Sequence, residues 1–334
     1  MPELPEVETT TRGLQKTIKG LVIRDVWTDL NTKDKRKRDT VASSRYFKIF
    51  KKEILGKKIL SIERRAKNIL INLSGGKTIL VHLKMTGHLL YGKYKPTSPP
   101  APLLNKERGL GRGSVWIPAK DGPLYDPFNR FVHTVFVFSN GKHLAFSDAR
   151  KFGKITLLDT VIAHDPEGKS TTSYGAGSKH LSNLGPEPLE KSFTLKKLKE
   201  CLKIRPNGKI KSILIDQRII AGIGNIYSDE ILWRSGVHPE RKVSTLKESE
   251  IKLMFKAIKE TLTKGINFGG DSMSDYRNIY GLPGKFQLHH EAYRRTGEKC
   301  RKKNPRLGGA SCQGIIIRKV INGRSAHFCS VHQK

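Results

Sequence analysis

Acidic residues, cysteines and long apolar runs are all scarce in this sequence. No run of about 18 apolar residues occurs, which disfavours a membrane-spanning helix. The first ten residues are acidic where a secretory signal would be basic and apolar, which disfavours secretion. Four cysteines in 334 residues are too few for a disulfide framework. We therefore expect a cytoplasmic protein with no membrane partner, associated with the nucleoid if its source is bacterial.

The shortage of acids leaves a large positive charge. Lys and Arg number 63 against 30 Asp and Glu, so the formal net charge is +33 and the sequence pI is near 10.1. Such a chain attracts polyanions, which makes nucleic acid the first candidate partner and an anionic membrane surface the second. A basic surface without a specific partner explains an excess of a few charges better than one of this size. The length predicts about two domains.

The apolar pattern changes along the chain. Residues 5–20 predict a first helix. Short apolar segments separated by Gly-rich turns then predict β structure up to about residue 158. A stretch rich in Gly, Ser, Thr and Pro over 159–188 predicts a linker. Two stretches interrupt the β pattern: 31–44, whose charge run at 33–38 is either a solvated loop or a phosphate contact, and the proline-rich 94–130.

The second half of the chain has a helical pattern. Helices are predicted over 194–204, 209–217 and 225–235. A capping box of Thr245 and Glu248 predicts the start of a further helix, which Gly265 ends.

Three of the four cysteines lie near the end of the chain together with a histidine. Their spacing is Cys300-x11-Cys312-x16-Cys329-x2-His332. The last two residues close a predicted β-hairpin that turns at Asn322–Gly323, and the two upstream cysteines can complete a tetrahedral site. Unrelated reduced cysteines are usually surrounded by apolar residues, whereas these are flanked by Lys, Arg, Gly and Asn. The pattern predicts one structural Zn²⁺ in a basic hairpin that presents Arg324 to DNA.

A glycine motif lies between two of the predicted helices. Gly222 and Gly224 form a turn, and Asn225 is expected as the N-cap of the next helix. The free N–H groups of that helix can hold a phosphate. An ordinary corner between two helices is the commoner origin of such a motif, so the motif alone is a weak signal.

The amino terminus offers a nucleophile. Met followed by Pro is expected to lose its Met, which leaves Pro2 with a free secondary amine. The pKa of an α-amine is about 7.7–8.0, so more of it than of a lysine is unprotonated at neutral pH. Attack on a sugar C1′ would give an iminium, and Glu3 could protonate the ribose or a leaving group. On these two residues alone, a Pro and a Glu that merely open a helix are the better explanation.

Seven motifs in order along the chain resemble the formamidopyrimidine-DNA glycosylase family, which shares its fold with endonuclease VIII. They are MPELPEVET, RRAKNIL, HLKMTG, SDARKFG, DQRIIAGIGNIYSDEIL, GGDSMSDYR and the cysteine-rich tail. The resemblance implies an α+β fold of four parts. These are an N-terminal helix with a two-layered antiparallel β-sandwich (1–158), a linker (159–188), a helical domain with a helix–two-turn–helix (189–290) and a zinc-finger β-hairpin (291–334).

The resemblance also implies residue roles. The implied catalytic group is Pro2, Glu3, Glu6, Lys67, Glu230 and Arg324. Pro2 is similar to the Schiff-base nucleophile, and Glu3 to the acid that opens and protonates the deoxyribose. The carboxylates of Glu6 and Glu230 would hold the amino terminus, and Lys67 would contact a phosphate near the lesion and assist β-elimination. Phosphate contacts are further implied for His82, Asn225, Arg324, His133 and Lys211.

Two further groups of residues would contact the damaged base or its partner. Met85, Arg150 and Phe152 resemble three side chains that fill the gap left by an extruded base. Extrusion costs a few kcal/mol of unstacking, which Met and Phe can offset by stacking while Arg bonds the orphaned base. The loop 269–277 resembles the segment that closes over an everted oxidised purine. It implies DNA contacts from Asp271, Ser272, Met273, Ser274, Tyr276 and Arg277.

The chain departs from the family's pattern in several places. The first cysteine spacing is x11, and His332 stands where a fourth cysteine is usual. Phe131 replaces one of two expected histidines beside His133. Lys151 replaces a second arginine, which keeps the charge but loses bidentate geometry. The insertions 31–44, 94–130 and 300–312 receive no role.

The sequence thus predicts a bifunctional DNA glycosylase and abasic-site lyase of base-excision repair. It would act as a monomer on double-stranded DNA that contains oxidised bases or abasic sites, bound in a cleft between the domains, and would need no cofactor for its chemistry. It would excise 8-oxoguanine and formamidopyrimidines and cleave the strand by β,δ-elimination. Two alternatives remain: an endonuclease VIII-like specificity for oxidised pyrimidines, and a non-catalytic zinc-finger DNA-binding protein.

Overall fold

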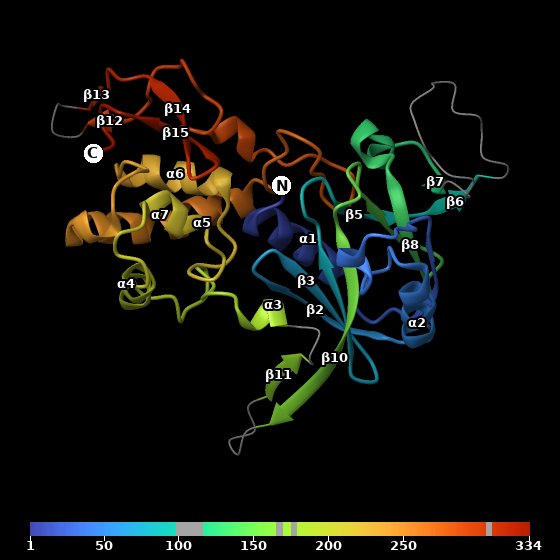
Figure 1. The fold of residues 1–334 in the computed structure, drawn as a ribbon. Coiled ribbons are helices and arrows are strands. Elements are labelled where there is room, and N and C mark those ends of the chain that lie inside the picture. The colour runs from blue at the N-terminus through green and yellow to red at the C-terminus, as the bar shows by residue number, and fades with distance from the viewer. Residues whose placement is uncertain (98–115, 165–169, 175–178, 305–308) are drawn as a thin grey trace. The chain divides into compact units, whose positions relative to one another are not determined.

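The computed structural model of this chain describes residues 1–97, 116–164, 170–174, 179–304 and 309–334 (Figure 1). The chain divides into two compact units. The first unit contains residues 1–2, 6–179 and 271–284, and the second contains residues 3–5, 180–270 and 285–334. A short segment from each half of the chain therefore belongs to the unit formed mainly by the other half.

The first unit is built on two antiparallel sheets. Their strand orders are β1-β8-β9-β5 and β11-β10-β4-β3-β2. The strands are β1 (Ile23–Thr28), β2 (Ile59–Arg65), β3 (Asn68–Leu73), β4 (Lys77–His82), β5 (His88–Gly92), β8 (Val132–Phe138), β9 (His143–Ser147), β10 (Lys154–His164) and β11 (Ser170–Tyr174). One apolar core takes side chains from both sheets, among them Val26 and Phe136 from the first, and Ile71 and Ile155 from the second. The predicted two-layered antiparallel sandwich is confirmed.

Two helices add to this core. α1 (Leu4–Thr17) buries Val7 and Leu14, and it ends three residues before the predicted stop at Gly20. α2 (Ser44–Ile54) was not predicted, although its apolar residues at 46, 47, 50 and 54 keep helical spacing. The lysines between them hid this amphipathic pattern inside a segment that looked like an insertion.

Residues 94–130 contain short elements of regular structure. They are β6 (Tyr94–Pro96), β7 (Trp116–Pro118) and the 3₁₀ turns η2 (Pro123–Tyr125) and η3 (Pro127–Asn129). β6 pairs with β7, and Tyr94 packs with Val132 and Ala145 in a second, smaller core. Residues 98–115 lie outside the described residues. A further 3₁₀ turn, η1 (Lys35–Lys37), occupies the charge run at 33–38.

The stretch 159–188, which we expected to be a linker, contains regular structure as well. β10 continues to His164 and pairs with β11, and α3 (Lys179–Ser182) follows. Residues 165–169 and 175–178 lie outside the described residues. The Ser- and Thr-rich composition suggested a linker, but Thr fits a strand as readily as a loop.

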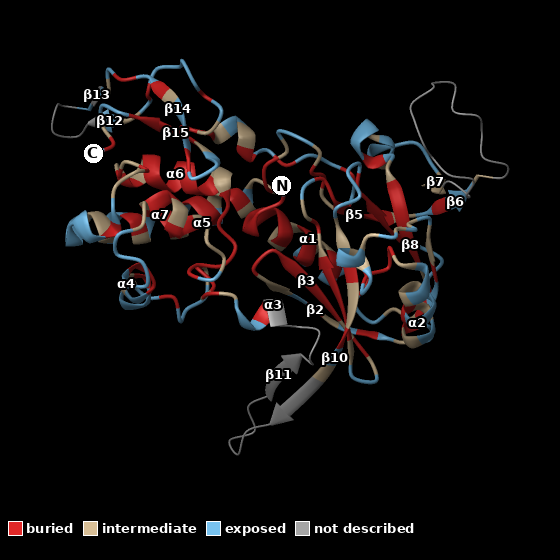
Figure 2. Cartoon of the chain, in the orientation of Figure 1, coloured by how far each residue is buried: buried red, intermediate tan, exposed pale blue. Residues whose placement is uncertain are grey.

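The second unit is mainly helical. Its helices are α4 (Leu195–Lys203), α5 (Ile210–Ile215), α6 (Asn225–Ser235) and α7 (Glu248–Asn267), with 3₁₀ turns η5 (Val243–Thr245) and η6 (Phe286–His289). All four helices were predicted, to within a few residues at each end. Leu198, Leu214, Ile231 and Ile258 belong to their common core. Figure 2 shows that α6 is buried over most of its length.

The start of α7 differs from the prediction. Thr245 lies in η5, where its hydroxyl donates to the Lys242 carbonyl (2.8 Å). The carboxylate of Glu250 instead accepts the N–H of Lys247 (2.7 Å). The i, i+3 spacing of the predicted capping box is therefore correct, but it applies two residues later, because the segment before it turns once as a 3₁₀ helix.

The chain ends in two short hairpins. They are formed by β12 (Lys303–Asn304) with β13 (Ala310–Ser311), and by β14 (Ile316–Ile321) with β15 (Arg324–Cys329). The second turns at Asn322 and Gly323, whose φ angles are +47° and +75°. This is the predicted Asn-Gly hairpin. Within the described residues, no helix is long and apolar enough to cross a membrane.

Candidate active site and nucleic-acid interface

The carboxylate of Glu3 lies at the amino-terminal end of α6, in the second unit. Its Oε1 accepts the N–H of Ile226 (2.9 Å), and its Oε2 accepts the N–H of Tyr227 (3.4 Å). Unpaired N–H groups at a helix start stabilise a negative charge. The helix end that we expected to be available to a phosphate therefore binds a side chain of the protein itself. Gly224, and not Asn225, is the N-cap residue.

The two glycines before α6 make room for the amino terminus. A Cβ at Gly224 would overlap the carboxyl carbon of Glu3. A Cβ at Gly222, whose φ is +91°, would lie 2.6 Å from the Cδ1 of Leu4. The Gly222 carbonyl also accepts the N–H of Leu4 (3.0 Å). Both positions require glycine, so the Gly-x-Gly-Asn motif holds residues 3 and 4 in place.

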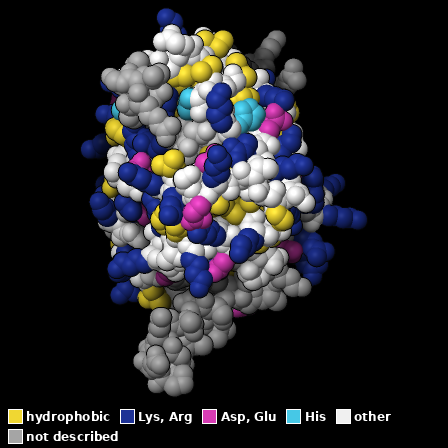
Figure 3. All heavy atoms as spheres, turned by 90° about the vertical axis from the view of Figure 1, so that its left-hand side faces the viewer, with side chains coloured by type: hydrophobic (Ala, Val, Ile, Leu, Met, Phe, Trp, Pro, Cys, Tyr) yellow, Lys and Arg dark blue, Asp and Glu magenta, His cyan; other side chains and the backbone are white. Residues whose placement is uncertain are grey.

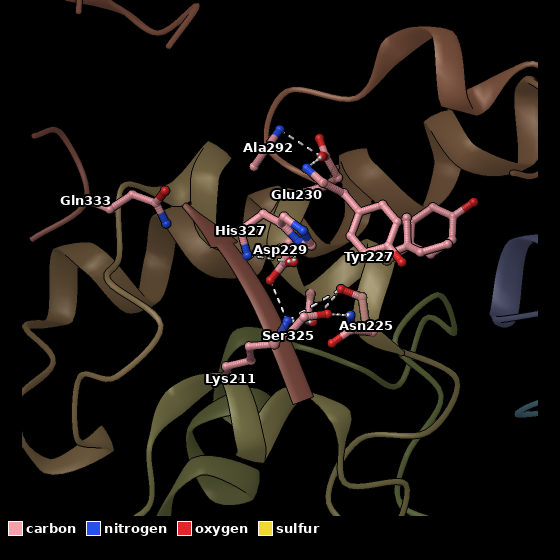
Figure 4. Close-up of polar contacts among 12 residues, drawn as sticks. Lys211, Asn225, Tyr227, Asp229, Glu230, Ala292, Ser325, His327 and Gln333 are labelled. Carbon is pink, nitrogen blue, oxygen red and sulfur yellow. Dashed lines mark hydrogen bonds and ion pairs between the residues drawn. The ribbon is translucent and has the colours of Figure 1, made fainter. Parts of the chain in front are cut away.

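Polar contacts hold the β14–β15 hairpin against α6 (Figure 4). The side-chain amide of Asn225 donates to the Ser325 hydroxyl (3.2 Å). The buried carboxylate of Asp229 accepts both the backbone N–H and the Nδ1–H of His327 (3.0 Å each). Arg324 is adjacent to Ser325 and is exposed. The structure thus brings Asn225 and Arg324, two predicted phosphate contacts, close together.

Lys211, for which a phosphate contact is predicted, is buried in the second unit. This side chain is 1% exposed, and its ammonium group forms an ion pair with Asp229 and donates to Ser228 Oγ (3.2 Å) (Figure 4). A buried lysine is stable when it is paired in this way, and the phosphate contact of Lys211 stays a prediction. Lys211 joins α5 to α6.

Glu230 contacts the backbone of a later segment of the second unit. Its buried carboxylate accepts the N–H groups of Glu291 (2.9 Å), Ala292 (3.0 Å) and Tyr293 (2.8 Å) (Figure 4). Burial raises the pKa of this carboxyl group. Glu230 therefore holds the segment that leads into the cysteine cluster, and its expected hold on the amino terminus stays a prediction.

The four predicted metal ligands come together in the second unit. The ligand atoms of Cys300, Cys312, Cys329 and His332 all lie within 4.8 Å of one another. The Sγ atoms of Cys312 and Cys329 are 3.7 Å apart, close to the tetrahedral edge of about 3.7 Å that follows from a Zn–S bond of about 2.3 Å. His332 directs Nδ1 at Cys300 Sγ (3.2 Å) and Nε2 at the Trp233 carbonyl (3.0 Å). Nδ1 is thus the available metal ligand, and Nε2–H fixes the ring.

In the first unit, Glu6 anchors the loop that follows α7. Its carboxylate accepts the N–H of Asp271 (2.7 Å), and its carbonyl accepts the hydroxyl of Tyr276 (3.1 Å). Burial raises the pKa of Tyr276 and keeps this donor protonated. Met273 and Ser274, between these two anchors, are exposed. The predicted lesion loop therefore has two fixed ends and an exposed tip.

Not all of the loop side chains assigned to DNA face solvent. Asp271, Tyr276 and Arg277 are 6%, 4% and 7% exposed, and the Ser272 hydroxyl donates to the Tyr276 carbonyl (2.7 Å). These contacts are directed into the protein. The side chains of Asp271, Tyr276 and Arg277 therefore shape the loop from within, and the DNA contacts expected of these residues stay predictions.

Basic side chains gather at one end of the second sheet. Lys67 lies in the two-residue turn between β2 and β3 and is buried. His82 ends β4, and its Cα pairs in register with Asn68 of β3 and Lys154 of β10. Lys67, His82 and Lys154 are thus neighbours across three strands. Lys154 was not predicted, because its place at this sheet end depends on strand order.

The three predicted gap-filling side chains lie on two connected turns. Met85 is 38% and Phe152 45% exposed, and the Arg150 guanidinium is 4.8 Å from the centre of the Phe152 ring. The Thr86 hydroxyl donates to the buried carboxylate of Asp148 and accepts the N–H of Arg150 (3.1 Å). This connection keeps the 84–87 turn beside the 148–153 turn.

Lys37, from the charge run, contacts the second of these turns. Its ammonium group donates to the Lys151 carbonyl (2.5 Å) and lies 5.9 Å from the centre of the Phe152 ring. No sequence signal pointed to this contact, because the two residues are 114 positions apart.

His133 does not reach the surface. It is 2% exposed, and its Nδ1 bonds to the Asp29 carboxylate (2.9 Å). Its Nε2 is buried without a hydrogen-bond partner among the described residues, and the phosphate contact expected of it stays a prediction. The ring instead connects the start of β8 with the end of β1.

Comparison with known proteins identifies the family. The sequence model of the formamidopyrimidine-DNA glycosylase N-terminal domain matches residues 1–155, and that of the formamidopyrimidine-DNA glycosylase H2TH domain matches residues 184–277. The chain belongs to the formamidopyrimidine-DNA glycosylase family. A formamidopyrimidine-DNA glycosylase of Pelotomaculum thermopropionicum is 37% identical over all of this chain and 99% of its own length. One of Herpetosiphon aurantiacus is 35% identical over the full length of both chains.

Solved structures of formamidopyrimidine-DNA glycosylase agree with this result. The Lactococcus lactis enzyme in complex with DNA that contains an abasic site has a TM-score of 0.71, with 30% identity over 99% of both chains. A variant of it in complex with DNA that contains a formamidopyrimidine has a TM-score of 0.72, with 30% identity over both full chains. The predicted family, fold class and class of activity, a DNA glycosylase, are confirmed. In this family member, Lys and Arg side chains are spread over the face drawn in Figure 3.

Proposed function

We propose that this formamidopyrimidine-DNA glycosylase removes oxidised purines from double-stranded DNA and then cleaves the strand. The observation that carries the proposal is the placement of Glu3. Its carboxylate is held by two backbone N–H groups of α6, directly next to Pro2 in the chain. A fixed acid beside a secondary amine is what Schiff-base chemistry at C1′ needs. The enzyme would act as a monomer, and its bacterial relatives favour a location in the cytoplasm.

The reaction begins once Met1 has been removed. The nitrogen of Pro2 attacks C1′, and the glycosidic bond breaks as the base leaves with a proton. Glu3 supplies the proton that opens the sugar ring, so that the Pro2 nitrogen and C1′ form an iminium. The iminium acidifies C2′, loss of that proton breaks the C3′–O bond, and a second elimination breaks the C5′–O bond. Hydrolysis then frees Pro2.

The remaining candidate residues would hold the DNA. Lys67, His82 and Lys154 offer one group of phosphate contacts, and Asn225 with Arg324 offers a second. Such contacts position a duplex without reading its sequence. Met85, Arg150 and Phe152 are exposed on connected turns, which suits insertion into a base stack. They would occupy the space of the extruded base.

The cysteine–histidine cluster would hold one structural Zn²⁺. Its donor set and its spacing fit a closed tetrahedral site, and the metal would fix the hairpin that carries Arg324 without taking part in the reaction. Metal analysis of protein purified without chelator should give one zinc per chain. Cys329→Ala should lose the zinc and bind duplex DNA more weakly. A well-folded hairpin in metal-free protein would contradict this assignment.

The preferred lesion is the open question within this proposal. The Gly-, Ser- and Met-containing loop 269–277 favours a flat oxidised purine. The Lactococcus lactis enzyme has been solved with DNA containing a formamidopyrimidine and with DNA containing an oxidised pyrimidine. Rates on 8-oxoguanine opposite cytosine and on thymine glycol should therefore be compared directly. Faster excision of thymine glycol would favour the pyrimidine alternative.

Borohydride trapping tests the central step. With a duplex that carries one 8-oxoguanine opposite cytosine, reduction of the iminium should give a covalent protein–DNA band. Untreated samples should show strand cleavage. A crosslink that forms on an abasic site but not on the 8-oxoguanine duplex would keep the lyase and move the substrate to another lesion. No crosslink on either would leave a non-catalytic DNA-binding protein.

Two variants assign the residues. Pro2→Gly and Glu3→Gln should each abolish base excision and keep binding to DNA, because neither side chain is needed to grip phosphates. Normal excision of 8-oxoguanine by Glu3→Gln would contradict the role of the acid. Mass spectrometry of the purified protein should confirm that Met1 is absent.

A further inference from the structure

Arg277, at the end of the lesion loop, is held by a segment that sequence analysis left without a role. Its guanidinium Nε donates to the Asp126 carboxylate (3.0 Å), and its Cζ lies 4.5 Å from the centre of the Phe128 ring. The Arg277 side chain is 8% exposed, and that of Asp126 is 24% exposed. Both partners belong to the stretch that contains η2 and η3, within the insertion 94–130, and all three residues lie in the first unit.

The same guanidinium fixes the backbone of the loop. Its Nη1 donates to the carbonyls of Ser274 (3.1 Å) and Tyr276 (2.9 Å). Ser274 is one of the two exposed residues at the loop tip. Asp126 therefore acts on the tip through Arg277, because the ion pair sets where the guanidinium lies and the guanidinium sets where the two carbonyls point.

A second set of contacts joins this segment to the chain just after the loop. The Asn129 amide donates to the carbonyls of Pro123 (2.9 Å) and Gly281 (3.4 Å), and its oxygen bonds to Nε2 of His88 (2.9 Å). A Cβ at Gly281, whose φ is +83°, would lie 2.5 Å from the Pro123 carbonyl oxygen. The segment thus packs closely against Gly281, just after the loop, and contacts the loop itself through the ion pair with Arg277.

We propose that residues 123–129 are a positioning element for the lesion loop, with Asp126 as its positioning residue. The proposal rests on the proposed function, in which the tip at Met273 and Ser274 covers the everted base. A tip held before the base arrives loses less conformational freedom on binding. The element therefore acts on the step that needs the base, and not on cleavage of a site that has already lost it.

The test compares two reactions of the full-length enzyme. Asp126→Asn keeps the side-chain oxygen that accepts the N–H of Phe128 but leaves the charge of Arg277 buried without its partner. Single-turnover excision of 8-oxoguanine should fall by about tenfold or more, because the nearly buried guanidinium of Arg277 loses the carboxylate that sets its position. Strand cleavage at a preformed abasic site should stay within about twofold, because that reaction has no base to cover.

Asp121→Asn is the matched control, because it removes an exposed carboxyl group from the same segment. It should leave both rates unchanged. If Asp126→Asn unfolds at the assay temperature, Phe128→Leu removes the ring beneath the guanidinium and should show the same selective loss. Asp126→Glu, which restores the charge, should recover part of the excision rate.

Three outcomes separate the possibilities. Selective loss of base excision supports the positioning element. Equal loss on both substrates, or normal excision by Asp126→Asn and Phe128→Leu, overturns it. Failure of the unchanged enzyme to excise any oxidised base would instead reject the proposed function itself.

Discussion

At the scale of single residues, the space at Gly224 decides how closely the Glu3 carboxylate approaches α6. No side chain fits between the helix start and the carboxyl carbon of Glu3. A helix N-terminus usually binds an external anion through the same groups. Here the anion is the carboxylate of Glu3, and the lack of a Cβ at Gly224 lets it come within hydrogen-bond distance of the N–H groups.

Gly224→Ala should therefore displace Glu3. A shift of about 1 Å in a reacting group can cost about 100-fold in rate, so excision should fall by roughly that factor while the protein stays folded. Single-turnover rates with a thermal melt of the same sample measure both effects. An Ala variant with the normal excision rate would show that Glu3 need not lie against the helix.

Sequence analysis placed residues well where their role depends on near neighbours in the chain. Gly222 and Gly224, the Asn-Gly turn and the Cys329–His332 pair are local patterns. The burial of Lys211 and His133 could not be predicted in this way, because it depends on partners outside their local motifs. Asp229 pairs with Lys211 from 18 positions away, and Asp29 bonds to His133 from 104 positions away.

At the scale of elements, the 148–153 turn is braced from two directions. Within the turn, the carboxylate of Asp148 accepts the N–H of Gly153 (2.7 Å). Lys37 holds it from η1, through the Lys151 carbonyl. Under the proposed function this turn would insert side chains into a base stack, and η1 would then help to keep the turn in shape.

Lys37→Met tests the brace and keeps the length of the apolar stem. We expect slower extrusion of the target base, because Phe152 and Arg150 lose a fixed support. A 2-aminopurine placed beside the lesion reports extrusion by fluorescence. Lys35→Met removes the same charge from the same turn, where Lys35 is exposed, and should extrude the base at the normal rate. Equal slowing in both variants would mean that charge alone matters.

Glu240 connects α5 to the terminal hairpin and should make their docking sensitive to acid. Lys209 and Lys319 donate to its two oxygens (2.7 Å and 2.6 Å) and lower its pKa from 4.5 to about 2. The folded pKa is the lower one, so the bridge stabilises the fold above pH 4.5 and is lost as the pH falls from 4.5 towards 2. The lysines are partly exposed, which keeps the effect modest.

Glu240→Gln should remove this part of the acid sensitivity. Its melting temperature should fall less than that of the unchanged protein as the pH drops through this range. Asp121→Asn, which lacks an exposed carboxyl group, should follow the unchanged protein. If the melting temperatures of all three proteins fall equally with pH, the Glu240 bridge does not contribute to the acid sensitivity.

Elements were easier to predict than their boundaries. The four helices of the second unit and the strands of the sandwich follow from apolar periodicity. The end of β10 and the whole of β11 were missed, because strands rich in Ser and Thr resemble loops in composition. The contacts of η1, η2 and η3 were beyond prediction, because each contacts a segment more than 100 positions away.

At the scale of the whole molecule, the net charge of +33 should govern binding to DNA. Each phosphate neutralised releases counterions, so affinity falls as salt rises. Arg324→Ala should weaken binding to damaged and undamaged duplexes alike and reduce the slope of log K against log salt by about one. Titrations at several salt concentrations measure this slope. A loss confined to the damaged duplex would contradict a phosphate contact.

The position of Glu3 against the start of α6 also sets an order of events during synthesis. The amide groups that bind its carboxylate are 223 and 224 positions further along the chain. A ribosome therefore releases Pro2 and the entire sandwich long before it makes the helix that places the acid. An unfinished or truncated chain is basic enough to bind a chromosome, yet it lacks a positioned proton donor. Under the proposed function, base excision would become possible only after the ribosome has made α6, which ends at Ser235.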